Sequence, residues 1–428
     1  MNSGKYMSRL FKIARDIFLI SLGKYGQYLI TLLTIPITAR ALGVEGLGFL
    51  AIGTGAYFFG SALVDFGLTQ LLAAKAATRS HVGNIRAAYA AWRGALLIPL
   101  LAFLVWVFAV PEMPTQLRMI ALGLFCGGLS SCGEDWVLIG RMKYGRLAGF
   151  QIVARIVYLG VLVTTMAYFP TPTAAILCLG LSSLVSSSLT WISVQRTDGV
   201  ARLRWKDVRF LISVGWPAFT SRIISASYQQ GATVLYSTVV APSTLGLYSS
   251  AEKIVRAAAS ALDAVGIALL PRMAKKSDQG FDFWPTAKRS VVIGALAGAV
   301  VALIVYLASP IIIDVLFGNA FESSKALLQA QVFALPAVAI SSIAITSILY
   351  VKGDTPGVLW AAITGLVVTA LVVAFSLRFP VAETLAWGLV ATEWTVAIFA
   401  LARVAWLYGK DVERHSLKRT TTEVGTPQ

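Results

Sequence analysis

Residues 290–313 read SVVIGALAGAVVALIVYLASPIII, a run without a charged side chain, with Lys288 and Arg289 before it and Asp314 after it. A helix rises 1.5 Å per residue, so roughly 20 apolar residues cross the ~30 Å hydrocarbon core of a bilayer. Comparable runs recur along the 428-residue chain, which is 57% hydrophobic and 13% charged. Such a composition lies far outside the range of soluble globular proteins. The sequence therefore predicts an all-α integral membrane protein.

These runs predict twelve membrane-spanning helices. The junction between the fifth and sixth is tight, at Pro170 and Pro172, and Pro380 separates the eleventh from the twelfth. The predicted spans are residues 16–39, 47–72, 88–109, 117–138, 148–168, 172–194, 210–235, 246–270, 290–313, 326–350, 357–377 and 385–408.

The positions of the positive charges predict the topology. Twenty-six of the 36 Lys and Arg residues lie before the first helix, after the last, or in or directly beside every second connection. The connections on the other side hold four, and the positive-inside rule then places both termini in the cytoplasm. The same rule accounts for the net charge of +16, so no nucleic-acid partner is expected.

Residues suited to catalysis or metal binding are scarce. The two histidines, His81 and His415, fall in a loop and in the tail, and the three cysteines lie in apolar helices without a CxxC pair. We expect no catalytic residue, no metal and no cofactor. The amino-terminal basic residues precede a full-length span without a small-residue cleavage site, so the first helix is expected to be retained.

The longest connections divide the chain into two halves. We predict a first six-helix bundle over 1–194, a cytoplasmic linker over 195–209, a second six-helix bundle over 210–408 and a disordered cytoplasmic tail over 409–428. Asp65 follows Gly48 by 17 residues and Asp263 follows Gly246 by the same distance. This faint repeat predicts two bundles related by a pseudo-two-fold axis along the membrane normal.

Polar side chains at steps of three and four mark four of the predicted helices, the first, second, seventh and eighth. Ser and Thr in such stripes often only join helices, but charges near the bilayer centre are costly. Arg222 and Arg256 lie too deep to reach the interface. Glu252, one turn before Arg256, is a candidate structural partner, whereas Arg222 has no acidic neighbour in sequence and is the strongest candidate for function.

Further charges in the spans complete the candidate site. Lys24 and Arg155 lie about 12 Å from the cytoplasmic face and either snorkel to it or line a cavity. Glu393 is either a counter-ion for a cation or a protonatable coupling group. The predicted cationic, substrate-binding set is therefore Arg222, Arg256, Lys253, Lys24 and Arg155, and the predicted coupling or counter-ion set is Asp65, Asp263, Glu252 and Glu393.

Short motifs carry a family resemblance. Residues 36–49, PITARALGVEGLGF, followed by Val64-Asp65-Phe66-Gly67-Leu68, resemble the polysaccharide-transport flippases, the Wzx or O-antigen translocase family. Gly246-Leu247-Tyr248 and Ala251-Glu252-Lys253-Ile254, with Pro271 after them, resemble that family's second-half signature. The family belongs to a superfamily that also holds multidrug extruders and peptidoglycan-precursor flippases.

The resemblance implies two six-helix bundles facing each other in a V, with the first, second, seventh and eighth helices around a central cavity. It implies transfer of an undecaprenyl-pyrophosphate-linked oligosaccharide from the cytoplasmic to the periplasmic leaflet of the bacterial inner membrane. The partners it implies are this lipid-linked oligosaccharide, the bilayer, and the polymerase and chain-length machinery of the pathway.

Two alternatives stay open at this point. A drug or organic-cation extruder of the same fold would present carboxylates as its dominant intramembrane charge, whereas the predicted set here is rich in cations. A membrane enzyme that polymerises or transfers sugars normally needs a sizeable loop to hold its catalytic groups. The external connections of this chain are about a dozen residues at most, and they lack a DxD-like or His-rich pattern.

Overall fold

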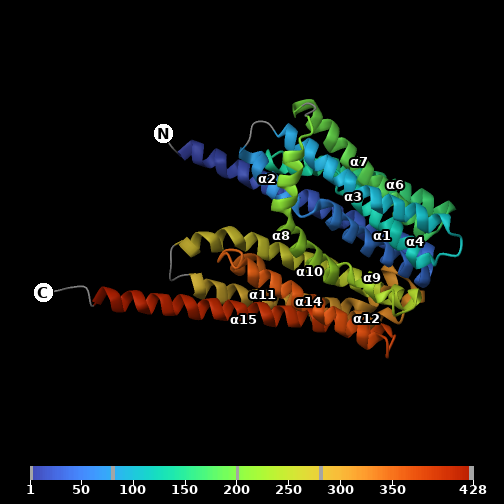
Figure 1. The fold of residues 1–428 in the computed structure, drawn as a ribbon. Helices are drawn as coiled ribbons and strands as arrows, with labels where there is room; N and C mark the ends of the chain where they lie inside the picture. The colour runs from blue at the N-terminus through green and yellow to red at the C-terminus, as the bar shows by residue number, and fades with distance from the viewer. Residues whose placement is uncertain (1–2, 79–81, 199–201, 279–282, 424–428) are drawn as a thin grey trace. The chain divides into compact units, whose positions relative to one another are not determined.

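The computed structural model describes residues 3–78, 82–198, 202–278 and 283–423, with side chains from Leu33 to Glu413 except 198, 264–265, 267–268, 270–272 and 274–278. All of the secondary-structure elements in this part of the chain are helices (Figure 1). The helices are α1 (Ser3–Asp65), α2 (Leu68–Thr78), α3 (Gly83–Ala109), α4 (Thr115–Ser130), α5 (Asp135–Gly140), α6 (Tyr144–Tyr168), α7 (Pro172–Asp198), α8 (Trp205–Gln229), α9 (Ala232–Tyr236), α10 (Pro242–Asp278), α11 (Phe283–Leu316), η1 (Asn319–Phe321), α12 (Ser324–Gln331), η2 (Val332–Ala334), α13 (Leu335–Ser342), η3 (Ile343–Leu349), α14 (Thr355–Ser376) and α15 (Ala382–Glu423).

The twelve predicted spans correspond in order to these helices, which confirms the all-α fold class. α1 contains the first span and most of the second, and its path changes at Gly43, whose φ of 66° is a conformation that favours glycine. Eight helical segments among the described residues are long and apolar enough to cross a bilayer. The chain is therefore a multi-pass membrane protein.

Three predicted continuous spans are broken in the structure. The second span, 47–72, is interrupted at Phe66 and Gly67, which both have positive φ. The fourth, 117–138, is divided into α4 and α5, with Gly133 between them, and the seventh, 210–235, is divided between α8 and α9 at Gly231. Each break contains a glycine, which has a low helix propensity. The hydropathy of the surrounding apolar residues does not reveal such a break.

The chain forms two compact units: Met1–Ser249 with Asp314–Phe321, and Ser250–Ile313 with Glu322–Gln428. The division falls within α10, whereas the sequence predicted it at the linker 195–209. The physical reason is the packing of α8, whose Phe219 ring stacks on Phe66 with ring centroids 4.4 Å apart. Val208 and Leu211 of α8 are buried in the same hydrophobic cluster as Phe66, within the first unit.

Glycines let α1 and α4 approach closely inside the first unit, where Figure 1 shows the two helices side by side. A Cβ at Gly127 would overlap the backbone oxygen of Tyr57, and a Cβ at Gly123 would overlap that of Gly53. In α1, a Cβ at Gly60 would overlap the backbone oxygen of Leu124. Such small-residue contacts are typical of helices that pack within a membrane.

The second unit has its own packing core. Gly294 and Gly298 of α11 lie against Ile343 and Pro336, and Ala337 of α13 is buried with Ala397 of α15. The π-helical segment η3 follows α13 directly, and its Ser347 hydroxyl donates a 2.6 Å hydrogen bond to the Gly266 backbone oxygen of α10.

The helix α15 continues to Glu423, so the prediction of a disordered tail from residue 409 is wrong for residues 409–423. Asp411 explains the extension, because its carboxylate accepts hydrogen bonds from Lys352 Nζ at 2.7 Å and from Trp284 Nε1 at 3.2 Å. These contacts hold α15 to the second unit one turn beyond the predicted end. Residues 424–428 of the predicted tail lie outside the described residues.

A second ion pair near this end gives a pH-dependent prediction. The hydrogen bonds that Asp354 accepts from Arg403, at 2.6 and 2.9 Å, are the main cause that holds the pKa of Asp354 below its usual value. The ionised form is therefore favoured in the folded state. Its stabilisation is complete above the usual carboxyl pKa of about 3.9 and is lost as the pH falls through the lowered pKa.

We expect Asp354→Asn to lower the free energy of unfolding by about 1–2 kcal/mol at pH 7, because it removes a charged hydrogen-bond acceptor that also caps α14. Thermal unfolding of both proteins at pH 7 and at pH 3 measures this. The difference in stability between wild type and variant should be smaller at pH 3 than at pH 7. An equal difference at both pH values would contradict the assignment of an ionised Asp354 paired with Arg403.

Candidate functional site

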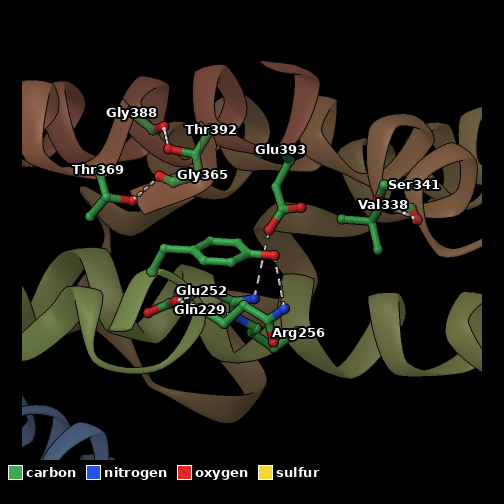
Figure 2. Close-up of polar contacts among 11 residues, drawn as sticks. Gln229, Glu252, Arg256, Val338, Ser341, Gly365, Thr369, Gly388, Thr392 and Glu393 are labelled. Carbon is green, nitrogen blue, oxygen red and sulfur yellow. Dashed lines mark hydrogen bonds and ion pairs between the residues drawn. The ribbon is translucent and has the colours of Figure 1, made fainter. Parts of the chain in front are cut away.

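Arg256 of α10 lies between two carboxylates of the second unit (Figure 2). Its Nε and Nη2 atoms each lie 3.2 Å from Oε1 of Glu252, one helical turn earlier. Its Nη1 atom lies 3.8 Å from Oε1 of Glu393 on α15. The side chain of Arg256 is 34% exposed, whereas those of Glu252 and Glu393 are 12% and 11% exposed.

This geometry bears on the alternatives left open for Glu393 and Glu252, whose coupling roles stay predictions. Both contact Arg256, so both have the position of a counter-ion. Two carboxylates and one guanidinium sum to one negative charge, and the neighbouring Lys253 brings the group close to neutrality. An anionic ligand at Arg256 must therefore compete with two resident carboxylates.

The hydroxyl groups shown around this ion group are occupied by their own helices (Figure 2). Thr392 donates to the Gly388 oxygen at 2.8 Å, Thr369 to Gly365 at 3.0 Å and Ser341 to Val338 at 3.1 Å. These hydroxyl groups therefore donate to their own helices and not to a ligand. The cationic side chains of this region are Arg256 and Lys253.

Arg222 lies in α8, in the first unit, and its side chain is exposed. Among the side chains that the structure describes, none forms a hydrogen bond or ion pair with Arg222. The exposed Gln229 lies seven residues further on the same helical face. The role of Arg222 in substrate binding stays a prediction.

The remaining predicted residues have varied surroundings. Asp263 of α10 is exposed. The side chain of Lys24 lies outside the described residues. Arg155 of α6 lines a pocket inside the first unit, whose described lining contains no other predicted cation.

Asp65 lies at the carboxyl end of α1 in a network of hydrogen bonds. The Tyr89 hydroxyl donates to its backbone oxygen at 2.8 Å and contacts its carboxylate at 3.1 Å, and Thr69 also donates to that carboxylate. These contacts join α1, α2 and α3 at the break in the second predicted span. Asp65 therefore has a structural role here, and its predicted coupling role stays a prediction.

A buried ion pair beside this network was missed from the sequence. Arg86 Nε lies 3.5 Å from Oε2 of Glu134, and their side chains are 5% and 1% exposed. The two residues lie 48 positions apart in the sequence, on α3 and just before α5, so their contact depends on the fold. Arg93, on the same face of α3 as Arg86, donates a 2.9 Å hydrogen bond to the Gly133 backbone oxygen. The spacing of Arg86, Tyr89 and Arg93 on one helical face was the available signal.

Comparison with known proteins identifies the family of this membrane protein. The chain belongs to the family described as polysaccharide biosynthesis protein, whose model matches residues 37–326. This membership confirms the resemblance found in the motifs.

A relative from Shigella dysenteriae, named "Putative O-antigen transporter", is 24% identical over 403 residues, which cover 91% of this chain and 99% of the relative. Lipid II flippase MurJ in an inward closed conformation has a TM-score of 0.73 at 12% identity, over 91% of this chain and 87% of that one. An inward-facing multidrug resistance MATE transporter has a TM-score of 0.56 at 14% identity, over 91% of this chain and 95% of that one. These structures confirm the twelve-helix, two-bundle fold.

Proposed function

We propose that this protein is a flippase that moves an undecaprenyl-pyrophosphate-linked oligosaccharide from the cytoplasmic to the periplasmic leaflet of the bacterial inner membrane. It works by alternating access, without enzymatic chemistry, for the assembly of O-antigen, exopolysaccharide or capsule. Family membership and the relation to an O-antigen transporter support the class of cargo. Both termini lie in the cytoplasm, as the distribution of basic residues predicts.

The single observation that carries the proposal is the exposed guanidinium of Arg222 on α8, which has no hydrogen-bond or ion-pair partner among the described side chains. A pyrophosphate needs cationic donors in a hydrated cavity, and guanidinium forms bidentate bonds with phosphate oxygens. Arg256, Lys253 and Lys24 are the further cations of the proposed cavity. Because Glu252 and Glu393 already contact Arg256, it contributes less to anion binding than Arg222 does.

A complementation experiment tests this function. A bacterium that lacks its own flippase, but makes the matching lipid-linked glycan, receives wild type, Arg222→Ala or Arg209→Ala at equal membrane abundance. We expect wild type and Arg209→Ala to restore surface glycan and Arg222→Ala to lower it at least about tenfold, which corresponds to the loss of one charge-assisted contact. Arg209 is the matched control, because it is exposed near the start of the same helix.

The outcomes separate the site from the function. Failure of wild type with its cognate pathway present would contradict the flippase proposal itself. Normal surface glycan with Arg222→Ala would leave the function standing and exclude Arg222 as an essential cation. The polymerase and chain-length machinery of the pathway are proposed partners of the same assembly.

One observation favours a second candidate, an organic-cation extruder of the same superfamily. The group of Glu252, Arg256 and Glu393 contains two carboxylates for one guanidinium, and a cationic drug would take the place of Arg256 between them. Export of a fluorescent organic cation by cells that express the wild type, lost in Glu393→Gln, would support this candidate.

A further inference from the structure

A small polar pocket lies inside the first unit, between α1, α4, α6 and α7. It has a volume of about 120 Å³, well above the roughly 10–15 Å³ that a cavity needs on the same measure to hold one water molecule. Its lining is Tyr57, Ser130, Gln151, Ala154, Arg155, Leu179, Ser182, Ser183 and Ser186. Arg155 brings a full positive charge to this lining, and the lining residues include no carboxylate.

The hydroxyl groups of the pocket are held in place. Tyr57 and Ser183 share a 2.6 Å hydrogen bond, the Ser183 hydroxyl lies 3.0 Å from the Leu179 oxygen, and the Ser182 hydroxyl donates to the Ala154 oxygen at 2.8 Å. The side chains of Tyr57, Ser182 and Ser183 are buried. The polar wall is therefore preorganised, so a ligand does not have to order these groups on binding.

Arg155 is electrostatically unusual within this wall. Among the side chains that the structure describes, no carboxylate forms an ion pair with Arg155. Asp135, which is not part of the lining, hydrogen-bonds to the lining residue Gln151 and interacts with Arg93. A partly buried guanidinium without a counter-ion is costly, and an anion in the pocket would remove that cost.

We propose that this Arg155 pocket binds an oxyanion, a carboxylate or phosphate carried on a group no larger than about one sugar ring. Bidentate bonds from the guanidinium fit either anion. The hydroxyl wall fits the polar remainder of a sugar acid better than a lipid tail. If the anion is an acidic sugar of the transported glycan, the inference rests on the proposed function. The binding itself does not require transport.

The test measures binding to the purified full-length protein at constant ionic strength, with sodium glucuronate, inorganic phosphate and neutral glucose as probes. Tryptophan fluorescence or calorimetry reports binding. We expect wild type to bind glucuronate at least about tenfold more tightly than glucose, because only the acid offers a charge-assisted bond. Arg155→Gln should abolish this preference, whereas Arg146→Gln, an exposed position on the same helix, should retain it.

Each outcome is decisive. Glucuronate bound more tightly than phosphate identifies a sugar acid as the ligand, and the reverse order identifies a phosphate group. Equal binding of glucose and glucuronate, no binding by wild type, or unchanged binding by Arg155→Gln overturns the proposal. If Arg155→Gln does not fold, Arg155→Lys keeps the charge without the bidentate geometry and should weaken oxyanion binding several-fold. None of these results depends on complementation, so the pocket and the flippase proposal fail separately.

Discussion

Gly127→Leu is expected to abolish accumulation of folded protein. The helices α1 and α4 touch backbone to backbone at this position, where even a Cβ would overlap the carbonyl oxygen of Tyr57. Overpacking of a filled core typically costs about 1–3 kcal/mol when side chains can move aside. Here the obstacle is backbone, which cannot move aside as a side chain can. We therefore expect the leucine to lower the free energy of unfolding by more than about 3 kcal/mol. Size-exclusion chromatography of the detergent-extracted protein measures the folded fraction.

Gly149→Leu is the matched control for this prediction. Gly149 lies on α6, and a Cβ there meets nothing within 4 Å, so this variant should retain the chromatographic profile and thermal midpoint of the wild type. Gly127→Ala should be intermediate in its effect. A Gly127→Leu variant that folds like the control would show that α1 and α4 are not in contact as described.

Glu134→Gln is expected to destabilise the first unit by about 3–5 kcal/mol, the usual cost of removing one partner of a buried ion pair. The carboxylate is 1% exposed, and its loss leaves the guanidinium of Arg86, itself 5% exposed, without this counter-charge. Thermal unfolding of the purified protein measures the loss. The double variant Arg86→Met/Glu134→Gln should recover most of it, because it removes the buried charge together with its partner.

The pair of Lys325 and Glu322 is a surface comparison. These side chains are 4.0 Å apart, and that of Glu322 is 81% exposed. Glu322→Gln should therefore change the free energy of unfolding by less than about 1 kcal/mol. Equal losses in Glu134→Gln and Glu322→Gln would contradict the assignment of a buried pair, and so would a double variant no more stable than Glu134→Gln.

The membrane fold was predictable because it follows from residue type and length alone. An apolar run such as 290–313 has no alternative to a spanning helix, and the structure extends it in both directions as α11. The breaks at Gly67, Gly133 and Gly231 were not predictable in the same way. They depend on partners distant in sequence, such as Ala218, whose backbone lies against Gly67.

The candidate site was only partly predictable. Sequence proximity identified Glu252 as a partner of Arg256, because an i,i+4 pair on one helix needs no knowledge of the fold. Glu393 lies 137 residues beyond Arg256, and its contact depends on the packing of α15 against the rest of the second unit. Arg86 and Glu134 were missed for the same reason, since Arg86 fell in a predicted connection and Glu134 near the end of the fourth predicted span.

The first unit is discontinuous in sequence, since Asp314–Phe321 belongs to it although the intervening Ser250–Ile313 does not. The Arg40 guanidinium donates a 2.9 Å hydrogen bond to the Val315 backbone oxygen across this separation. During synthesis, α1 and α4 can associate as soon as Ser130 has left the ribosome. The unit as a whole is complete only after Phe321 has been made. A fragment that ends at Ser249 would therefore lack Asp314–Phe321 of the first unit. Cutting the chain at one position cannot separate the two units.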